Sequence, residues 1–262
     1  MLARVVLLPL LILLIWLPSV DDASRPQPAP LTGATNENRR QSQPQQDSEE
    51  IIITPIYHAS LVLQYGGKAI YVDPRNRGDY HGLPMADLVL VTDIHPDHLD
   101  IEAIAQRMGI NTVVIGPAAV SRQWGGVDVV LKNGERKQFG DILVEAVAMY
   151  NIKRGPSEGQ LYHDKGRGNG YVVTFGGKRI YISGDTECTA EMRRLEDIDI
   201  AFVCMNLPYT MTPGEAAECV KAFRPKIVYP YHYRGSDLGV FTWALKDTPE
   251  VEVKLLDWYP KP

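Results

Sequence analysis

The stretch Thr92-Asp93-Ile94-His95-Pro96-Asp97-His98-Leu99-Asp100 places four side chains that can bind a metal within six residues. It follows the apolar run 86–91, which predicts a buried strand. Asp93, His95 and Asp97 are two residues apart, so in an extended segment they leave the same side, and the second imidazole can reach a neighbouring point as the chain turns. The stretch therefore predicts a two-centre metal site. A polar loop with an aspartate helix cap is the simpler alternative, but a cap needs no imidazoles.

An internal repeat organises the rest of the folded chain. Residues 65–73 and 175–185 each contain a Gly-Gly pair, which predicts a hairpin turn, followed by a strand that leads to an aspartate. Because two such halves cannot each cover their own sheet, we expect two sheets face to face with helices outside. The predicted fold is α/β (α+β), a four-layer αββα sandwich built from two repeated halves. Strand, helix and strand follow in the same order in both copies, at 88–91, 101–108 and 111–117 and at 200–203, 215–223 and 225–232, with further strands at 127–131, 142–149 and 251–256.

The metal-binding stretch resembles the His-x-His-x-Asp-His signature of the metallo-β-lactamase superfamily, with Asp93 where the first histidine normally stands. It is most similar to the branch that contains the L-ascorbate-6-phosphate lactonases. The resemblance runs from about Ile51 to the C-terminus, and it implies the same αββα fold. The departure at Asp93 bears on the identity of the metal, because a carboxylate is a harder ligand and adds a negative charge.

The resemblance implies further ligands at the ends of predicted strands. Asp185 follows the strand 179–182 and would bridge two metals, whereas His232 ends the strand 226–231 and would be the last ligand. A single histidine at a strand end is more often a hydrogen-bonded structural residue, so the order of the whole set carries the inference. The implied ligands are Asp93, His95 and His163 for one ion, Asp97, His98 and His232 for the other, and Asp185 between them.

Two divalent ions in this site would suit hydrolysis. Three carboxylates and a bridging hydroxide balance their four positive charges, and the ions would lower the pKa of the bridging water. The hydroxide would attack a lactone, an ester or a phosphodiester, with Asp97 as the proton acceptor and later donor. Zinc is the expected metal for mixed imidazole and carboxylate ligands, and the oxygen ligand at position 93 makes manganese and iron(II) the alternatives.

Other residues are candidates for supporting roles. Asp73 occupies an acidic position that the superfamily shares, and we expect it to brace the ligand loop as a hydrogen-bond acceptor without binding metal. The segment 151–171 is Gly-rich and basic, and it would grip an anionic substrate beside His163, with a solvated loop as the alternative. The candidate substrate-contacting residues are His58, Lys165, Arg167, Asn169, Tyr209 and Thr210.

The composition limits the partners. The net charge is -5, and without a Lys/Arg cluster there is little electrostatic reason for nucleic acid to bind, so we expect a small-molecule substrate. Residues 1–23 contain a short apolar run that predicts a secretory signal, with an uncleaved N-terminal anchor as the alternative and the only expected membrane contact. Residues 24–50 predict a disordered linker before the hydrolase domain 51–262. We therefore expect export to the periplasm or the cell exterior; the oligomeric state is left open.

The three cysteines show no short spacing typical of a disulfide framework or a zinc ribbon. Cys204 lies in a predicted strand and Cys219 in a predicted helix, where small buried thiols are common. Export would permit one disulfide, but the sequence favours free cysteines.

Two other functions use the same fold or the same ligands. Iron-dependent sulfur dioxygenases lack the second ligand set, which Asp97, His98 and His232 would supply here, and di-iron redox relatives append an electron-carrier domain for which we find no flavin-binding extension. A non-catalytic exported metal-binding protein is the third interpretation. Structural zinc sites are usually closed and rich in cysteine, unlike this ligand set.

Overall fold

The computed structural model describes residues 50–259. The predicted signal segment 1–23 and the linker 24–50, apart from Glu50, lie outside the described residues. Within the range 50–259, none of the helices has the length and apolar character needed to cross a membrane.

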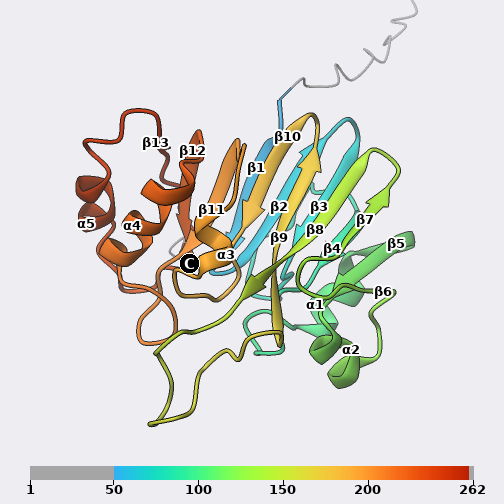
Figure 1. The fold of residues 1–262 in the computed structure, drawn as a ribbon. Helices are drawn as coiled ribbons and strands as arrows, with labels where there is room; N and C mark the ends of the chain where they lie inside the picture. The colour runs from blue at the N-terminus through green and yellow to red at the C-terminus, as the bar shows by residue number, and fades with distance from the viewer. Residues whose placement is uncertain (1–49, 260–262) are drawn as a thin grey trace, which may run out of the picture. The chain divides into compact units, whose positions relative to one another are not determined.

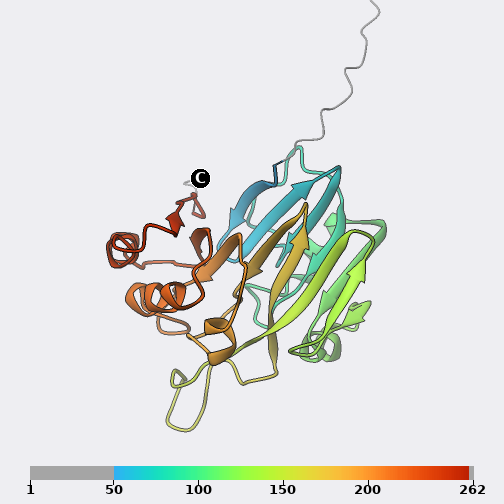
Figure 2. The same cartoon turned by 45° about the horizontal axis from the view of Figure 1, so that its top comes forward.

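Two sheets make up the centre of the molecule. In Figures 1 and 2 the strands of the second sheet, mostly coloured yellow-green to orange, lie across those of the first, coloured blue through cyan to green. The first sheet has the strand order β1 (Ile52–Tyr57), β2 (Ser60–Tyr65), β3 (Lys68–Val72), β4 (Ala86–Leu90), β5 (Met108–Gly116) and β6 (Val129–Val130). The second has the order β13 (Glu252–Val253), β12 (Ile227–Tyr231), β11 (Ile200–Cys204), β10 (Lys178–Ile182), β9 (Gly168–Phe175), β8 (Ile142–Met149) and β7 (Arg136–Phe139).

The pairing of the strands confirms the predicted repeat. In the first half β2 and β3 are antiparallel, and β4 and β5 continue the sheet in parallel. In the second half β9 and β10 are antiparallel, and β11 and β12 continue in parallel. The two hairpins also turn alike, because Gly66-Gly67 has φ values of 55° and 74° and Gly176-Gly177 has 56° and 71°, a region that glycine enters freely.

The core lies between the sheets, with a second apolar layer outside the first sheet. Successive strand residues point to opposite faces, so Leu63 packs with Val173 of the second sheet, whereas its neighbour Val62 packs with Ile104 and Val120 of the outer helices. This alternation explains why both faces of the first sheet are buried. The fold class predicted from the sequence, a layered sandwich of sheets and helices, is therefore confirmed.

The helices cover the outer faces of both sheets (Figure 1). Two follow strands of the first sheet, α1 (Ile101–Arg107) and α2 (Ala118–Trp124), and three follow strands of the second, α3 (Ala190–Arg193), α4 (Pro213–Phe223) and α5 (Leu238–Ala244). The side chain of Asp100 caps α1, and Thr212 caps α4 in a capping box with Glu215. These local signals fix where the loops that carry the candidate ligands end.

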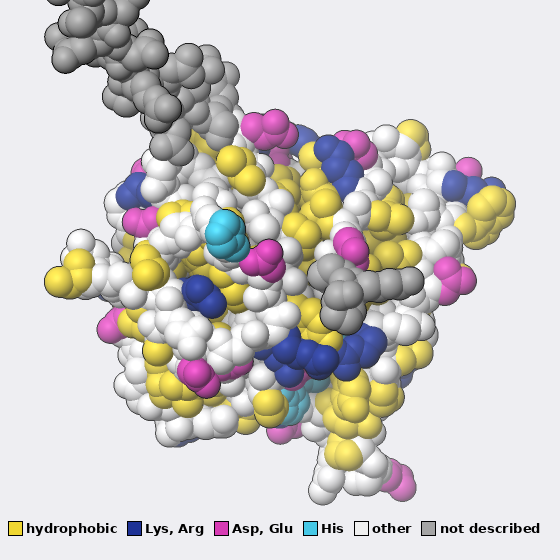
Figure 3. Space-filling model, turned by 180° about the vertical axis from the view of Figure 1, so that it is seen from behind, with side chains coloured by type: hydrophobic (Ala, Val, Ile, Leu, Met, Phe, Trp, Pro, Cys, Tyr) yellow, Lys and Arg dark blue, Asp and Glu magenta, His cyan; other side chains and the backbone are white. Residues whose placement is uncertain are grey.

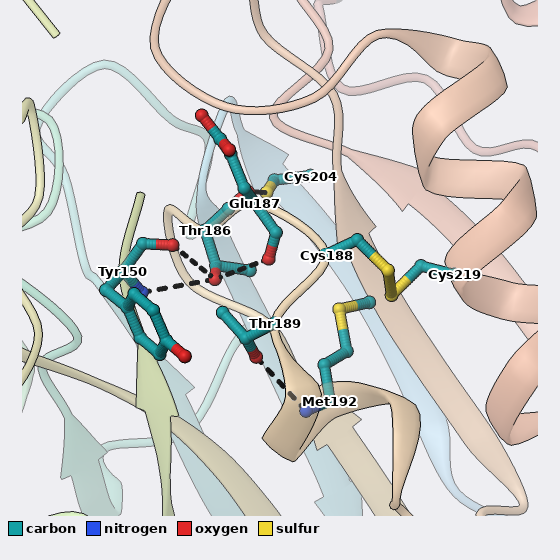
Figure 4. The surroundings of a disulfide bond; sticks show 8 residues. All are labelled: Tyr150, Thr186, Glu187, Cys188, Thr189, Met192, Cys204 and Cys219. Carbon is teal, nitrogen blue, oxygen red and sulfur yellow. Dashed lines mark hydrogen bonds between the residues drawn. A yellow bond between two sulfur atoms is a disulfide. The ribbon is translucent and has the colours of Figure 1, made fainter. Parts of the chain in front are cut away.

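One expectation about the cysteines is wrong. Cys188 and Cys219 form a disulfide with a Cα–Cα distance of 5.6 Å, and Cys204 stays a buried free thiol within the described chain (Figure 4). The two partners are 31 residues apart, one in the loop after β10 and the other on the buried side of α4. Packing of that helix over the loop brings them together, and no short sequence motif records such a contact.

Candidate metal centre

The predicted ligands meet at one edge of the two sheets. Asp93 to His98 follow β4, Asp185 follows β10, and His232 follows β12. Because the carboxyl ends of parallel strands lie at the same edge of a sheet, these loops converge. His163 reaches the same place from the loop before β9. Each half of the repeat therefore supplies ligands: the first supplies 93–98 and the second supplies His163, Asp185 and His232.

Three residues at this edge have left-handed backbone conformations although they are not glycines. His58, Asp73 and His232 have φ values of 59°, 43° and 47°. Such a conformation costs a residue with a side chain about 1 kcal/mol or more, and it persists where the surroundings impose it. Here it turns all three side chains into the space between the two halves.

Asp185 occupies the middle of the cluster. Its Oδ2 lies 3.3 Å from Nε2 of His98 and 3.3 Å from Nε2 of His163, and its Oδ1 lies 3.3 Å from Nε2 of His232. All four residues are buried, and these three Nε2 atoms and Oδ1 of Asp185 find no hydrogen-bond partner among the described residues. Buried polar atoms are normally paired, so this convergence of lone pairs fits a bound cation.

Three overlapping groups of side chains could hold metal ions. In each group the ligand atoms lie within 4.8 Å of one another. The groups are Asp93, His95 and His163; His98, Asp185 and His232; and His58, Asp97 and His232. The sequence separated the ligands in a similar way but did not place His58 beside Asp97, where its Nε2 lies 3.3 Å from Oδ2.

Two buried acceptors orient the histidine rings. Asp73 Oδ2 lies 2.8 Å from Nδ1 of His98, and the same carboxylate accepts hydrogen bonds from the backbone and hydroxyl of Thr92 at 2.8 and 2.6 Å. Oδ1 of Asn151 lies 2.7 Å from Nδ1 of His163 and accepts from its backbone N–H at 2.9 Å. With the ring proton held at Nδ1, each Nε2 presents its lone pair to the cluster. Asn151 has no sequence signal that points to this role.

Asp93 is engaged in an ion pair that the sequence did not predict. Arg167 donates from Nε to Oδ1 at 3.0 Å and from a terminal nitrogen to Oδ2 at 2.7 Å, a two-pronged contact. Oδ2 also lies 2.9 Å from Nδ1 of His95 and 3.8 Å from Nε2 of His163. Burial alone would raise the pKa of Asp93, but hydrogen bonding to His95 and the nearby positive charges lower it to about 2.

The other carboxylates of the cluster are also ionised at neutral pH. Burial opposes ionisation of Asp97, but its close contacts with His232 at 3.4 Å and His58 at 3.3 Å hold its pKa far below the usual range. Burial likewise opposes ionisation of Asp185, and the neighbouring His232 and His98 keep its pKa well below normal. Ionised carboxylates and imidazole lone pairs together form a donor set suited to zinc, manganese or iron(II).

The cluster opens into a cavity of about 350 Å³. The predicted contacts His58 and Tyr209 line this cavity, as does Asp97. The sequence missed the remaining polar lining, because these residues come from separate loops without a shared motif: Tyr162, Asn206 and Arg234.

The structure places the other predicted substrate contacts elsewhere. Lys165 lies 2.6 Å from Glu191, outside the described lining of the cavity. Asn169 is buried and donates its amide to the carbonyl of Leu131 at 2.9 Å. The hydroxyl of Thr210 is buried and bonds within its own loop. The charged and amide groups of the Gly-rich segment therefore serve local structure and the pairing of Asp93.

Comparison with known proteins identifies relatives of the whole folded part. Residues 52–232 match the model of the β-lactamase superfamily domain. A UPF0173 metal-dependent hydrolase of Anaeromyxobacter sp. (strain K) is 30% identical over 230 residues, which cover 80% of this chain and 82% of that protein. Another, from Pelotomaculum thermopropionicum, is 31% identical over 220 residues, which cover 78% of this chain and 96% of that protein.

Solved structures show the same fold. A protein from Parabacteroides distasonis ATCC 8503, provisionally named a metal-dependent hydrolase, has a TM-score of 0.73 and 42% identity, covering 78% of this chain and 92% of that one. Igni18, a metallo hydrolase from Ignicoccus hospitalis, has a TM-score of 0.65 at 21% identity, covering 79% and 95%, and shows a likeness of fold alone. The likeness to L-ascorbate-6-phosphate lactonases stays a prediction. Because the family match spans most of the described residues and the relatives cover the chain at 30% identity, this chain belongs to the metallo-β-lactamase superfamily and, within it, to the UPF0173 family.

Proposed function

We propose that this protein is a metal-dependent hydrolase with two divalent ions, most simply zinc, that cleaves a lactone, an ester or a phosphodiester. The observation that carries the proposal is the set of three unpartnered Nε2 atoms around the buried carboxylate of Asp185. The relatives in the same family are named metal-dependent hydrolases, which agrees with this chemistry. Two bound ions would lower the pKa of a water held between them and polarise the scissile group.

The side chains at the cavity can move the proton that such a reaction releases. Asp97 lines the cavity and enters the reaction ionised, so it can accept a proton from the attacking water and pass it to the leaving group. His58 lies between Asp97 and Tyr259, with its Nδ1 2.6 Å from the tyrosine hydroxyl. Burial lowers the pKa of His58 to about 4, so the ring is neutral at pH 7 and can relay a proton.

The charge of the centre favours an anionic substrate. Three aspartates and a hydroxide balance two divalent ions, and Arg167 then leaves one positive charge in excess. A phosphodiester, or an ester or lactone that carries a carboxylate, would neutralise this excess positive charge. Arg167 would then contribute to anion attraction through the charge of the centre, because its guanidinium is held on Asp93.

The test measures metal content and hydrolysis in the same preparations. We expect close to two divalent ions per chain, turnover of at least one among a panel of lactones, esters and bis-p-nitrophenyl phosphate, and loss of that turnover in Asp97→Ala. Asp247→Ala, which removes an exposed carboxylate elsewhere, is the control. One iron per chain without hydrolysis would contradict the proposal and favour oxidative chemistry.

We also propose that the protein is exported, as the apolar start of the sequence suggests. The Cys188–Cys219 disulfide supports this proposal, because such bonds persist mainly in oxidising compartments. Cell fractionation with thiol labelling of the native protein tests it. A protein found in the cytoplasm with three reactive thiols after denaturation would contradict it.

A further inference from the structure

We propose that Arg234 and Arg77, whose guanidinium groups both lie near the ring of Tyr57, form a binding site for an oxyanion group of the substrate that lies away from the bond that is cleaved. This inference rests on the proposed hydrolase function and deepens it by naming a substrate class. The class is a small ester, lactone or phosphodiester that carries a second anionic group, either a carboxylate or a phosphate.

Arg234 is held at the mouth of the metal-site cavity. It lies two residues after His232 in the sequence, and it lines the same cavity as Asp97 and His163. Its backbone N–H donates to the hydroxyl of Tyr259 at 2.9 Å, and its guanidinium donates to the hydroxyl of Tyr57 at 2.8 Å. The guanidinium carbon lies 6.0 Å and 5.9 Å from the centres of these two rings. Two tyrosines thus position this cation before any substrate arrives.

Arg77 brings a second positive charge to the same ring. It belongs to the loop after β3, and its guanidinium carbon lies 5.2 Å from the centre of the Tyr57 ring. Both arginines are exposed, and no carboxylate of residues 50–259 forms an ion pair with either of them. Figure 3 shows a patch of Lys and Arg side chains that borders histidine side chains on the face seen from behind.

Two uncompensated guanidiniums near one aromatic ring repel each other, and an anion placed between them would relieve that repulsion. Guanidinium groups bind carboxylates and phosphates through paired hydrogen bonds, with more geometric specificity than an ammonium group. The basic residues predicted for this task are already occupied, since Lys165 pairs with Glu191 and Arg167 pairs with Asp93. Arg234 is therefore the available cation among the described residues that line the cavity, and Arg77 lies near it across the ring of Tyr57.

The size of the cavity limits the substrate. A volume of about 350 Å³ is near the lower end for small-molecule sites. Because Arg234 and Asp97 line the same cavity, one small molecule can place its scissile group at the candidate metal ligands and its second anionic group at Arg234. A neutral ester would fill only the first position.

The test compares p-nitrophenyl hemisuccinate with p-nitrophenyl acetate, which has the same leaving group and no second charge. We expect wild type to prefer the anionic ester, with the difference mainly in KM. Arg234→Gln should lower kcat/KM for the hemisuccinate about 10-fold or more and change the value for the acetate less than 2-fold. Arg77→Gln, which removes no hydrogen bond seen in the fold, should act in the same direction, and Arg234→Lys should retain part of the preference. Arg136→Gln, on the edge strand β7, is the control.

A binding measurement separates this inference from the proposed function. Titration calorimetry with methyl phosphate should show weaker binding to Arg234→Gln and Arg77→Gln than to wild type and to the control Arg136→Gln. If wild type hydrolyses both esters equally and Arg234→Gln changes neither rate, the oxyanion site is refuted while the hydrolase stands. If neither ester is hydrolysed, the hydrolase proposal loses support, and methyl phosphate binding that depends on the arginines still decides the oxyanion site.

Discussion

The guanidinium of Arg167 lies 2.7 Å from Oδ2 of Asp93, and its Nε lies 3.0 Å from Oδ1. The superfamily signature has a histidine at position 93, and the ion pair carries the same net charge as a neutral histidine. The substitution that singled out this chain at the sequence level is thus balanced by a residue 74 positions later. If Asp93 binds metal as proposed, the pair replaces one imidazole by an oxygen ligand without making the centre more negative.

Asp93 and Arg167 should therefore tolerate substitution only when both are replaced together. Asp93→His leaves a guanidinium with 19% of its side chain exposed next to three imidazoles and without its carboxylate, so we expect lower metal content and a loss of about 2 kcal/mol of stability. Asp93→His combined with Arg167→Gln should recover most of both. Metal analysis and denaturant unfolding of wild type, Asp93→His, Arg167→Gln and the double variant check this. Additive effects of the two substitutions would contradict the coupling.

Metal affinity should depend on Asp73 although it touches no ion. Asp73→Asn weakens the acceptor that fixes the Nδ1 proton of His98, and we expect about 10- to 100-fold weaker metal binding in competition with a chelator. Asp87→Asn is the matched control, because Asp87 is a part-buried carboxylate of the same sheet that accepts from the backbone of Ala69. If Asp73→Asn and wild type bound metal with equal affinity, Asp73 would not be needed to orient His98 for metal binding.

Acid should weaken the start of α4 through Glu215. Burial would raise the pKa of this carboxyl, but hydrogen bonds from Thr212, Lys153 and Arg154 outweigh it and lower the pKa from 4.5 to about 2. A depressed pKa in the folded state means that the stabilisation is present above pH 4.5 and is lost as the pH falls toward 2. Glu215→Gln should cost about 1 kcal/mol at pH 7, and the gap to wild type should narrow below pH 4. Urea unfolding at both pH values measures the gap; a constant gap would contradict this assignment.

Reduction of the disulfide should destabilise the fold without exposing the core. Closing a loop of 31 residues restricts the unfolded chain and is worth about 3–4 kcal/mol in the chain-entropy model. Cys188→Ser combined with Cys219→Ser should show a loss of this size in denaturant unfolding. Cys204→Ala keeps the disulfide and serves as the control for the loss of a buried thiol. An unchanged midpoint in the double serine variant would show that the bond contributes nothing measurable.

Short sequence patterns correctly predicted the features that depend on neighbouring residues, such as turns, strands and helix positions. The Gly-Gly hairpins, the strand 142–149 and the helix 215–223 are all visible in short windows of sequence, and the structure has them at or near those positions. Even the ends of short strands were less certain, since the strand expected at 251–256 is only Glu252–Val253. Edge strands have few partners to fix their length.

The features that escaped prediction all depend on contacts between distant segments. Arg167 finds Asp93, Asn151 finds His163, and Cys188 finds Cys219 only after the sheets and helices have packed. Arg234 is near His232 in sequence, but its importance arises from Tyr57 at the other end of the domain. Residue type and spacing do not reveal such partners, because a contact between distant segments leaves no pattern in the sequence around either residue.

Both halves of the repeat contribute candidate ligands, so a bound ion would cross-link the two halves. His98 belongs to the first half and Asp185, His163 and His232 to the second, so an ion held by them would link two layers that are also joined by apolar packing and by the ion pair of Arg167 with Asp93. A cation bound only by the folded state adds RT ln(1 + [M]/Kd) to stability, or about 2.7 kcal/mol at 100 times Kd. Melting temperatures measured with a series of metals would therefore rank the affinities of the site for these metals, even before a substrate is known.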